Sequence, residues 1–438
     1  MVSVNTNLDN YSYWEILLAI FGGYSSDFEY TATGIFRRTM PPVCPKCGMA
    51  MNYNGYNTYG KIGLGSVKIG RYICPCCGGT CEEERDFWEK LKWEFFGVIN
   101  RITQLMRLHH VSYQGISDML ELIYPRGKDT IFNDFAGSVE RTVIPPPAEE
   151  IQIILYDEQH PKAGRTQKFR LTLLDGVTGQ PIAEELHDSK DSATILAFLA
   201  KYLDPTKRTF VVTDLYVSYP KILKEFFGKN LIHQLCLMHL NKRIVGDFPS
   251  NTTIEQELMK YRLLNIFYNR DAEIAVLRRM AEEEQEMKQR DKKEYKRWLR
   301  KQKVAFRKFL HEQELKRRRA KKNLEQRPYI EALRMFDELM EEIESFDKPV
   351  QKRLRMIGKN WAHLTAFYFV KGGQATNNWV ENYYSTSLKT HRKKQITSDR
   401  GIENQMKLSA MKRAGLLGRC KKTLLEAFLM FVPFLKSG

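Results

Sequence analysis

Two kinds of residue in this 438-residue sequence have the types and spacing to do chemistry, namely paired thiols and acids that follow apolar runs. The thiols form two C-x-x-C pairs joined by a Gly- and Tyr-rich segment with the alternation of a β-ribbon. Four thiolates at this spacing predict a structural zinc site with Zn–S distances of about 2.3 Å. The predicted ligands are Cys44, Cys47, Cys74 and Cys77. Cys76 and Cys81 lie close by, and either could replace Cys77.

Two acids follow apolar runs that are typical of strands buried on both faces. "IQIILYDEQH" is near-continuously apolar until Asp157, and "RTFVVTDLY" carries Asp214 at its end. Ligands of open α/β sheets bind at the carboxyl ends of parallel strands, so we expect Asp157 and Asp214 to meet at one edge. The alternative is that both are ordinary loop residues.

A third acid would complete a site for two divalent cations, because a metal pair needs at least three carboxylate arms. In "ATNNWVENYYSTSLKTHRKK" we expect a helix that opens at Thr376 and directs Glu381 into a polar crevice. Its polar face would hold Asn377, Asn378, Glu381, Asn382 and Ser385, and its apolar face Val380, Tyr384 and Leu388. An ordinary surface glutamate is the alternative for Glu381.

Elements of alternating type must position these acids. Between the two apolar strands, "KFRLTLLDGVTGQPIAEEL" predicts a hairpin and "SATILAFLAKYL" a helix. From about residue 250 to 350 the strand pattern disappears, and alternating charge at helical spacing predicts an all-helical segment rather than a coiled coil. Trp298 and Trp361 could stack on an unpaired base, although core packing is the commoner role of tryptophan.

Cys236 and His239 form a C-x-x-H pair after the predicted strand "LIHQL". Two ligands do not complete a zinc site, so a buried thiol with a hydrogen-bonded imidazole is the simpler interpretation.

The residues after the second thiol pair predict three helices. "DFWEKLKWEFFGVINRITQLMRLHH" has one apolar face, Ser112 is a candidate N-cap, and the next helix would bury Ile116, Met119 and Leu120. Pro125 and Gly127 break that helix, and a third follows from Asp129. This is the pattern of a helix-turn-helix, in which the helix Thr130–Val139 would present Thr130 and Asn133 to a DNA groove. Many three-helix units share the pattern without binding DNA.

Charge indicates the class of partner. The sequence contains 69 Lys and Arg against 52 Asp and Glu, a net charge of +17 at pH 7. Such an excess favours a polyanion, most often nucleic acid. Candidate phosphate contacts are Lys316, Arg317 and Arg318 in "KRRRAKK" and Lys389, Arg392 and Lys393 in "KTHRKK". No apolar run reaches the roughly 18 residues of a membrane span, and clustered cysteines suit an intracellular protein, so we expect a soluble, unexported chain.

Four motifs, "LYDEQHPK", "VVTDLYVSYP", "QLCLMHL" and "TNNWVEN", together resemble the DDE transposases with a ribonuclease H-like core. They are most similar to the insertion-bearing group that includes mutator-like and related prokaryotic insertion-sequence transposases. The resemblance runs from about residue 150 to 410 and makes Asp157, Asp214 and Glu381 the catalytic acids. Glu158 directly follows Asp157, so the first metal ligand could be either.

The resemblance implies a chemistry and its partners. Two Mg²⁺ ions, replaceable by Mn²⁺, would be bridged by Asp157, with Asp214 and Glu381 on either side, and His239 would orient a carboxylate or contact the scissile phosphate. The reaction would be cleavage at transposon ends and transfer of the 3′-OH into target DNA. The partners would be duplex DNA and a second copy of the chain or more, in the prokaryotic cytoplasm at the nucleoid. The competing classes are a domesticated DNA-binding protein and a nuclease that cuts without joining.

The expected fold is therefore multidomain α/β, with a ribonuclease H-like mixed-sheet core interrupted by an all-helical insertion and preceded by a zinc ribbon and a helix-turn-helix domain. The expected boundaries are an N-terminal segment 1–40, the zinc ribbon 41–84, the helix-turn-helix 85–147, the first part of the core 148–248, the insertion 249–358, the second part of the core 359–419 and a C-terminal helix 420–438.

Overall fold

The computed structural model of the chain divides into two compact units, one formed by Met1–Ile144 with Lys407–Gly438 and the other by Pro145–Met406. It describes residues 28–31, 33, 35–61, 65–83, 85–121, 126–146, 152–161, 168–388, 393, 396 and 398–417. Pro125, Lys389, Arg392 and the expected C-terminal helix 420–438 lie outside the described residues.

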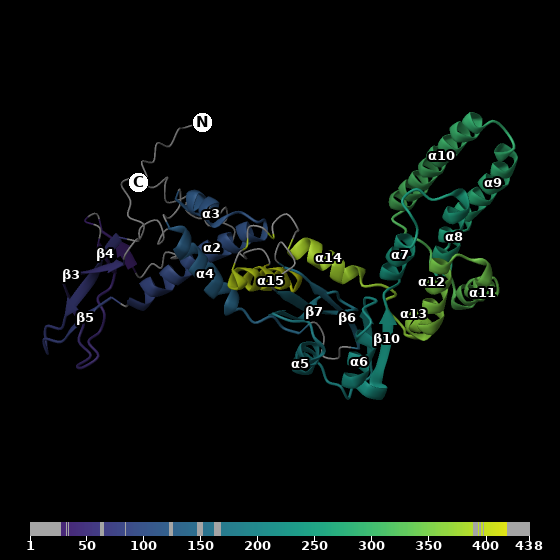
Figure 1. The fold of residues 1–438 in the computed structure, drawn as a ribbon. Coiled ribbons are helices and arrows are strands. Elements are labelled where there is room, and N and C mark those ends of the chain that lie inside the picture. Colours follow the sequence, from purple (N-terminus) through teal and green to yellow (C-terminus); the bar gives the residue numbers. More distant parts are fainter. Residues whose placement is uncertain are drawn as a thin grey trace. The chain divides into compact units, whose positions relative to one another are not determined.

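The first unit contains a five-stranded sheet (Figure 1). Its strands are β1 Phe28–Tyr30, β2 Ile35–Arg38, β3 Asn52–Lys61, β4 Gly65–Ile73 and β5 Thr80–Glu82. The antiparallel pair β3–β4 is the ribbon expected between the two thiol pairs. β2 pairs in parallel with β4, so strands that precede residue 41 belong to the same sheet as the ribbon. Strands of three and four residues are too short for an alternation to predict them.

Three helices follow in the first unit, α2 Arg85–Leu108, α3 Tyr113–Leu120 and α4 Lys128–Glu140. Ser112 caps α3 as expected, since its hydroxyl accepts a hydrogen bond from the Gly115 N–H at 3.0 Å. Ile116 and Leu120 are buried, but Met119 is 48% exposed, which corrects the expected core. α3 is only two turns long, so one i, i+4 pair covers its inner face.

The second unit contains a mixed sheet in the order β10-β9-β6-β7-β8. Its strands are β6 Ile153–Gln159, β7 Phe169–Asp175, β8 Pro181–His187, β9 Thr209–Thr213 and β10 Leu231–Leu235. β6, β7 and β8 are antiparallel, as the hairpin pattern predicts. β9 pairs in parallel with β6, and β10 in parallel with β9, so β6, β9 and β10 end at the same edge.

Alternate residues of the central strands pack on opposite faces of this sheet. Ile154, Tyr156 and Val211 pack with helices α5 Ser192–Tyr202 and α6 Tyr219–Phe227. Ile153, Leu155 and Val212 pack instead in the cluster that contains the later helices. Both faces are therefore covered, which explains the near-continuous apolar runs.

The later helices of the second unit are α7 Leu237–Gly246, α8 Ile254–Leu264, α9 Asp271–Lys288, α10 Lys292–Arg319, α11 Tyr329–Glu341, α12 Lys348–Lys359, α13 Trp361–Thr365 and α14 Asn378–Ser387. Residues 249–358 are all described and contain no strand, in agreement with the expected helical segment. Figure 1 shows α9 and α10 as two long helices side by side.

The two tryptophans considered for base stacking are both packed within this unit. Trp361 stacks on Phe267 and Phe336 against the core, and Trp298 stacks on Tyr295. Core packing therefore accounts for Trp361 and stacking on α10 for Trp298.

The last helix within the described ranges is α15 Asp399–Arg413. Its residues to Met406 belong to the second unit, and those from Lys407 belong to the first, where Leu408 and Met411 pack with Phe135 and Val139. None of the helices in the described ranges is long and apolar enough to cross a membrane.

Candidate functional site

Two short turns position the four thiols of the first unit, and their backbones are alike. In the first turn Gly48 N–H donates to the Cys44 carbonyl, and in the second Gly78 N–H donates to the Cys74 carbonyl. Gly48 has φ 72° and Gly78 has φ 67°, in the left-handed region that glycine adopts without strain. Each C-x-x-C-G sequence therefore folds locally into a loop that directs both of its thiols inward.

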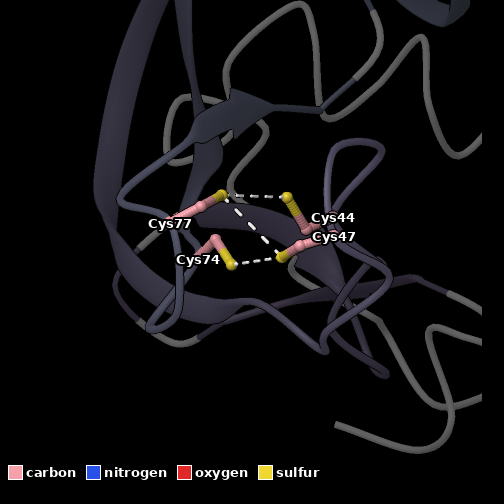
Figure 2. A group of neighbouring side chains, drawn as sticks. All are labelled: Cys44, Cys47, Cys74 and Cys77. Carbon is pink, nitrogen blue, oxygen red and sulfur yellow. Dashed lines mark hydrogen bonds between the residues drawn. The ribbon is translucent and has the colours of Figure 1, made fainter.

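The thiols of Cys44, Cys47, Cys74 and Cys77 converge (Figure 2). The Sγ–Sγ distances are 3.6 Å for Cys44–Cys77, 3.4 Å for Cys47–Cys74 and 3.8 Å for Cys47–Cys77. Four sulfurs placed tetrahedrally about 2.3 Å from zinc would be about 3.8 Å apart. The four thiols could therefore bind a zinc ion with little rearrangement.

The other two thiols nearby lie outside this cluster. Cys76 is exposed, and the Cys81 thiol contacts the Met51 sulfur at 3.4 Å. The N–H groups of Cys77 and Cys76 point at the Cys74 thiol and lower its pKa to about 6. A thiol that ionises near neutrality is a ready metal ligand.

The three acids of the second unit lie on one face of its sheet. Asp157 is the fifth residue of β6, so it shares a face with Ile153 and Leu155. The strand continues to Gln159, two residues further than the sequence predicts. Asp214 directly follows β9. Glu381 lies on α14, whose Val380, Tyr383 and Tyr384 pack in the same cluster as Ile153 and Leu155.

The adjacent acid, Glu158, faces the opposite side of the sheet. Its carboxylate accepts hydrogen bonds from the hydroxyls of Tyr156, at 2.8 Å, and of Tyr219 on α6. Lys190 lies 3.8 Å away. Glu158 is therefore occupied by groups of the α5–α6 side, which favours Asp157 as the first acid.

The acids interact electrostatically. Burial raises the pKa of Asp157 well above its ordinary value, and the negative charge of Asp214 adds to the rise, with a smaller contribution from Glu381. Asp214 is held by the Tyr216 N–H, which donates to its carboxylate at 2.8 Å. The Arg243 guanidinium on α7 donates to the Leu215 carbonyl at 2.8 Å and fixes the backbone beyond Asp214.

Two cationic or titratable side chains of α7 contact Glu381. Lys242 Nζ lies 2.9 Å from the Glu381 carboxylate, and His239 Nε2 lies 3.4 Å from the same oxygen. Burial lowers the pKa of His239, whereas the charges of Glu381 and Asp214 act in the opposite direction. His239 therefore lies within the field of two of the acids, beside the carboxylate of Glu381.

Hydrogen bonds fix the end of β6 to α14. The buried Asn377 amide donates to the Tyr156 carbonyl at 2.7 Å, and the Tyr384 hydroxyl donates to the Asp157 carbonyl at 2.8 Å. Asn377 N–H also donates to the Cys236 sulfur at 3.2 Å, which accounts for the buried thiol. Asn377 is the N-cap position and is fully buried, which corrects its expected place on a polar face and the expected helix start at Thr376.

A buried ion pair supports α14 from the sheet. Arg170 on β7 has no exposed side-chain surface, and its Nε donates to Glu184 on β8 at 2.7 Å. The same guanidinium donates to the Ser387 hydroxyl at 2.9 Å, and the Tyr383 hydroxyl donates to Glu184. This network positions the helix that carries Glu381.

The acids are more widely spaced than the thiols. Across the part of the chain that the structure describes, the four cysteines are the one group of three or more metal-ligating side chains with ligand atoms all within 4.8 Å. Asp157, Asp214 and Glu381 thus lie on one face of the sheet and interact electrostatically, but their carboxylate oxygens are not all within 4.8 Å of one another.

The residues expected to contact DNA lie in different surroundings. Thr130 and Asn133 are exposed on α4. Lys316 is exposed, but Arg317 and Arg318 at the end of α10 both form ion pairs with Glu314. Lys393 Nζ donates to the His160 carbonyl at 2.6 Å, so the chain itself uses this amine.

Sequence patterns did not reveal how three groups position the acids. Arg170 lies in an apolar strand, where its burial has no local signal, and Lys242 is one of many lysines. Asn377 precedes the helix by one residue, so an N-cap preference could have identified its position but not its bond to Tyr156.

Comparison with known proteins finds a similarity to a protein of an insertion element. No protein-family model matches the sequence. The chain is 25% identical over 220 residues to an uncharacterized 48.3 kDa protein of insertion element ISM1 from Methanobrevibacter smithii. The alignment covers 46% of this chain and 52% of that protein, so the chain spans about half the length of the curated relative it matches.

Proposed function

We propose that this chain is a DNA transposase that cleaves DNA at the ends of a mobile element and joins the freed 3′-OH to target DNA. The observation that carries the proposal is the presence of Asp157, Asp214 and Glu381 on one face of one sheet, where burial and the charges of the other two acids raise the pKa of Asp157. The similarity to a protein of an insertion element supports a role in transposition.

The catalytic unit is proposed to be a ribonuclease H-like core with an inserted helical segment. Three antiparallel strands followed by two parallel ones, in the order β10-β9-β6-β7-β8, support this assignment. The interval from α8 to α12, which contains only helices and loops, separates Asp214 from Glu381 and would be the insertion.

The acids fit a pair of Mg²⁺ ions by the chemistry of their donor set. Carboxylate oxygens are the ligands Mg²⁺ prefers, and divalent charge would offset the burial and the neighbouring Asp214 charge that raise the pKa of Asp157. Carboxylates that hold two ions between them need not contact one another, which agrees with their wider spacing. When bound, the ions would activate the attacking hydroxyl or water and stabilise the leaving 3′ oxygen.

The side chains of the site would have separate roles. Asp157, Asp214 and Glu381 would hold the ions. His239 would orient the Glu381 carboxylate, whose oxygen it approaches at 3.4 Å. Lys242 neutralises Glu381 in this structure and would release it when cations bind.

The first unit is proposed to recognise the DNA. A four-thiol zinc ribbon would stabilise the β3–β4 hairpin, and α3 with α4 would form a helix-turn-helix that presents Thr130 and Asn133 to a groove. Joining two ends of an element implies at least a dimer on DNA.

The test is a cleavage and joining assay with labelled element ends and Mg²⁺. The wild-type chain should yield cut and joined products, Mn²⁺ should replace Mg²⁺, and Ca²⁺ should permit binding with little turnover. Asp214→Asn should abolish both products. Asp188→Asn is the matched control, because it removes an acid that is 83% exposed and follows the edge strand β8.

Each other outcome assigns the chain to a competing class. Cut products without joined ones, lost in Asp214→Asn, would identify a ribonuclease H-like nuclease. DNA binding without either product would identify a domesticated DNA-binding protein. Equal activity of Asp214→Asn and the wild type would refute the assignment of the acids.

A further inference from the structure

The surface of α10 carries a concentration of positive charge that the cleavage chemistry does not use. The helix has thirteen Lys and Arg against three Glu in 28 residues, and Phe306 is its one buried residue. Its apolar side chains, including Trp298, Leu299, Phe309 and Leu310, pack toward α8 and α9. The opposite face is therefore presented outward, on one of the two long helices seen side by side in Figure 1.

Seven exposed cations occupy this outward face: Lys293, Lys296, Arg297, Arg300, Lys301, Arg307 and Lys308. They recur at spacings of three and four residues, so they share one side of the helix over about 22 Å. Within the described ranges no carboxylate forms an ion pair with any of the seven. We call these seven residues the α10 cation face.

The end of the same helix differs. Arg317 and Arg318, which the sequence singled out as phosphate contacts, are already paired with Glu314. The unpaired charge thus lies two to six turns earlier than the run "KRRRAKK" indicates. Uncompensated like charges at adjacent turns repel one another, so the binding of an anion that neutralises them is favourable.

We propose that the α10 cation face binds the phosphate backbone of duplex DNA; this inference rests on the proposed function for the identity of the polyanion. A duplex carries one charge per about 1.7 Å of its axis, so about 13 phosphate charges lie along a 22 Å face. Three of the seven cations, Arg297, Arg300 and Arg307, carry guanidinium groups, which bind phosphates in bidentate fashion.

A lipid surface fits this face less well. Helices that lie on membranes insert their apolar side, but the apolar side of α10 is packed against its own unit. The outward face has one exposed apolar residue, Val304, at 50% exposure. Contacts made only to phosphates would add affinity without sequence preference.

The decisive experiment measures DNA affinity against salt concentration for two matched triple variants of the full chain. The test variant is Arg297→Gln/Arg300→Gln/Arg307→Gln. The control is Arg278→Gln/Arg279→Gln/Lys288→Gln, which removes three exposed cations from the neighbouring α9, a helix that also carries six acidic residues and pairs Lys288 with Glu284. Both carry Asp214→Asn, so that no cleavage occurs, and circular dichroism verifies that both fold.

The ligand is a random-sequence duplex. If all three arginines contact phosphates, the slope of log K against log salt should become shallower by about 2.7 in the test variant. The control substitutions should change this slope by less than the loss of one phosphate contact would, which is about 0.9. Equal slopes in the two variants, or an unchanged slope in the test variant, would overturn the inference.

A second readout locates the contact directly. A photoreactive benzoylphenylalanine at Val304, in the middle of the cation face, should cross-link to the duplex, whereas the same group at the exposed Ala275 of α9 should not. Cross-linking at both sites, or at neither, contradicts a specific face. Capture of anionic vesicles in preference to the duplex would assign the face to a membrane and overturn the proposal.

The outcomes separate this inference from the proposed function. If the chain binds DNA through α10 but neither cuts nor joins it, the inference about the α10 cation face is supported and the proposed transposase function is refuted. If the chain cuts and joins DNA but the two variants have the same salt slope, the proposed function is supported and the inference about the α10 cation face is refuted.

Discussion

The four thiols of the first unit come from two turns that flank the β3–β4 hairpin, whereas the three acids of the second come from β6, the end of β9 and α14, at positions 157, 214 and 381. The thiols are within 4.8 Å of one another before any ion is considered. The acids repel one another and are held apart by bonds to their own surroundings. Local turns can assemble a metal site outright, but a site built from distant elements depends on the groups that position those elements.

The largest effect should come from removing one thiol. Cys74→Ser should abolish zinc binding and unfold the β3–β4 ribbon, because structural zinc contributes about 10–16 kcal/mol of apparent binding free energy to such modules. Metal analysis and amide hydrogen exchange would measure this, with the second unit retaining its protection. Cys76→Ser, which changes an exposed thiol outside the cluster, should retain the zinc. Loss of zinc in both variants would mean that the ligand set is different.

A large effect is also expected in the support of the acid site. Arg170→Met leaves the buried Glu184 carboxylate, 6% exposed, without its partner, and breaking such a pair costs about 3–5 kcal/mol. Denaturant unfolding would measure the loss. Lys201→Gln, on α5, breaks an ion pair with Glu185 of the same strand β8. Because Lys201 is 62% exposed, this change should cost less than about 1 kcal/mol. Equal costs would show that Arg170 contributes no more than a surface contact.

Acid should act on the second unit through His233. Burial, together with repulsion from His363, lowers the pKa of His233 from 6.5 to about 3. Since the unfolded chain takes up this proton first, the contribution of His233 to stability is complete above pH 6.5 and is lost as pH falls from there toward 3. At pH 4.5 the loss should be about 2–3 kcal/mol.

The His233→Gln variant tests this dependence. Its free energy of unfolding should fall less between pH 7 and pH 4.5 than that of the wild type. His311→Gln, which removes an exposed imidazole on α10, should behave like the wild type. A His233→Gln curve parallel to that of the wild type would contradict the prediction.

The smallest effect on stability concerns Lys242. Its ion pair with Glu381 joins side chains that are 56% and 34% exposed, so Lys242→Gln should change the free energy of unfolding by less than about 1 kcal/mol. Removing a positive charge beside the acids should nevertheless tighten Mn²⁺ binding about threefold to tenfold, by Coulomb attraction at moderate dielectric. Calorimetric titration would measure this. Lys224→Gln, on α6, should leave the Mn²⁺ affinity unchanged.

The sequence predicted best those features that depend on neighbours along the chain. The thiol turns, the Ser112 cap, the central strands and the apolar face of α14 all follow from local spacing. The Met119 assignment was wrong because a helical spacing does not say how many turns the rest of the unit covers. The burial of Asn377 and the use of Lys393 by His160 depend on residues that only the fold brings together, whereas the pairing of Arg317 with Glu314 is an i, i+3 contact that helical spacing could have indicated.

The bonds that tie α14 to the sheet have a consequence for how fast the acid site can respond. Asn377 and Tyr384 anchor the helix to the backbone of β6, and Tyr383 anchors it to Glu184. Moving the helix would break all three bonds at once, whereas the Glu381 side chain can turn about its own single bonds. Release of Glu381 from Lys242 therefore needs only a rotamer change, which takes picoseconds to nanoseconds in exposed side chains.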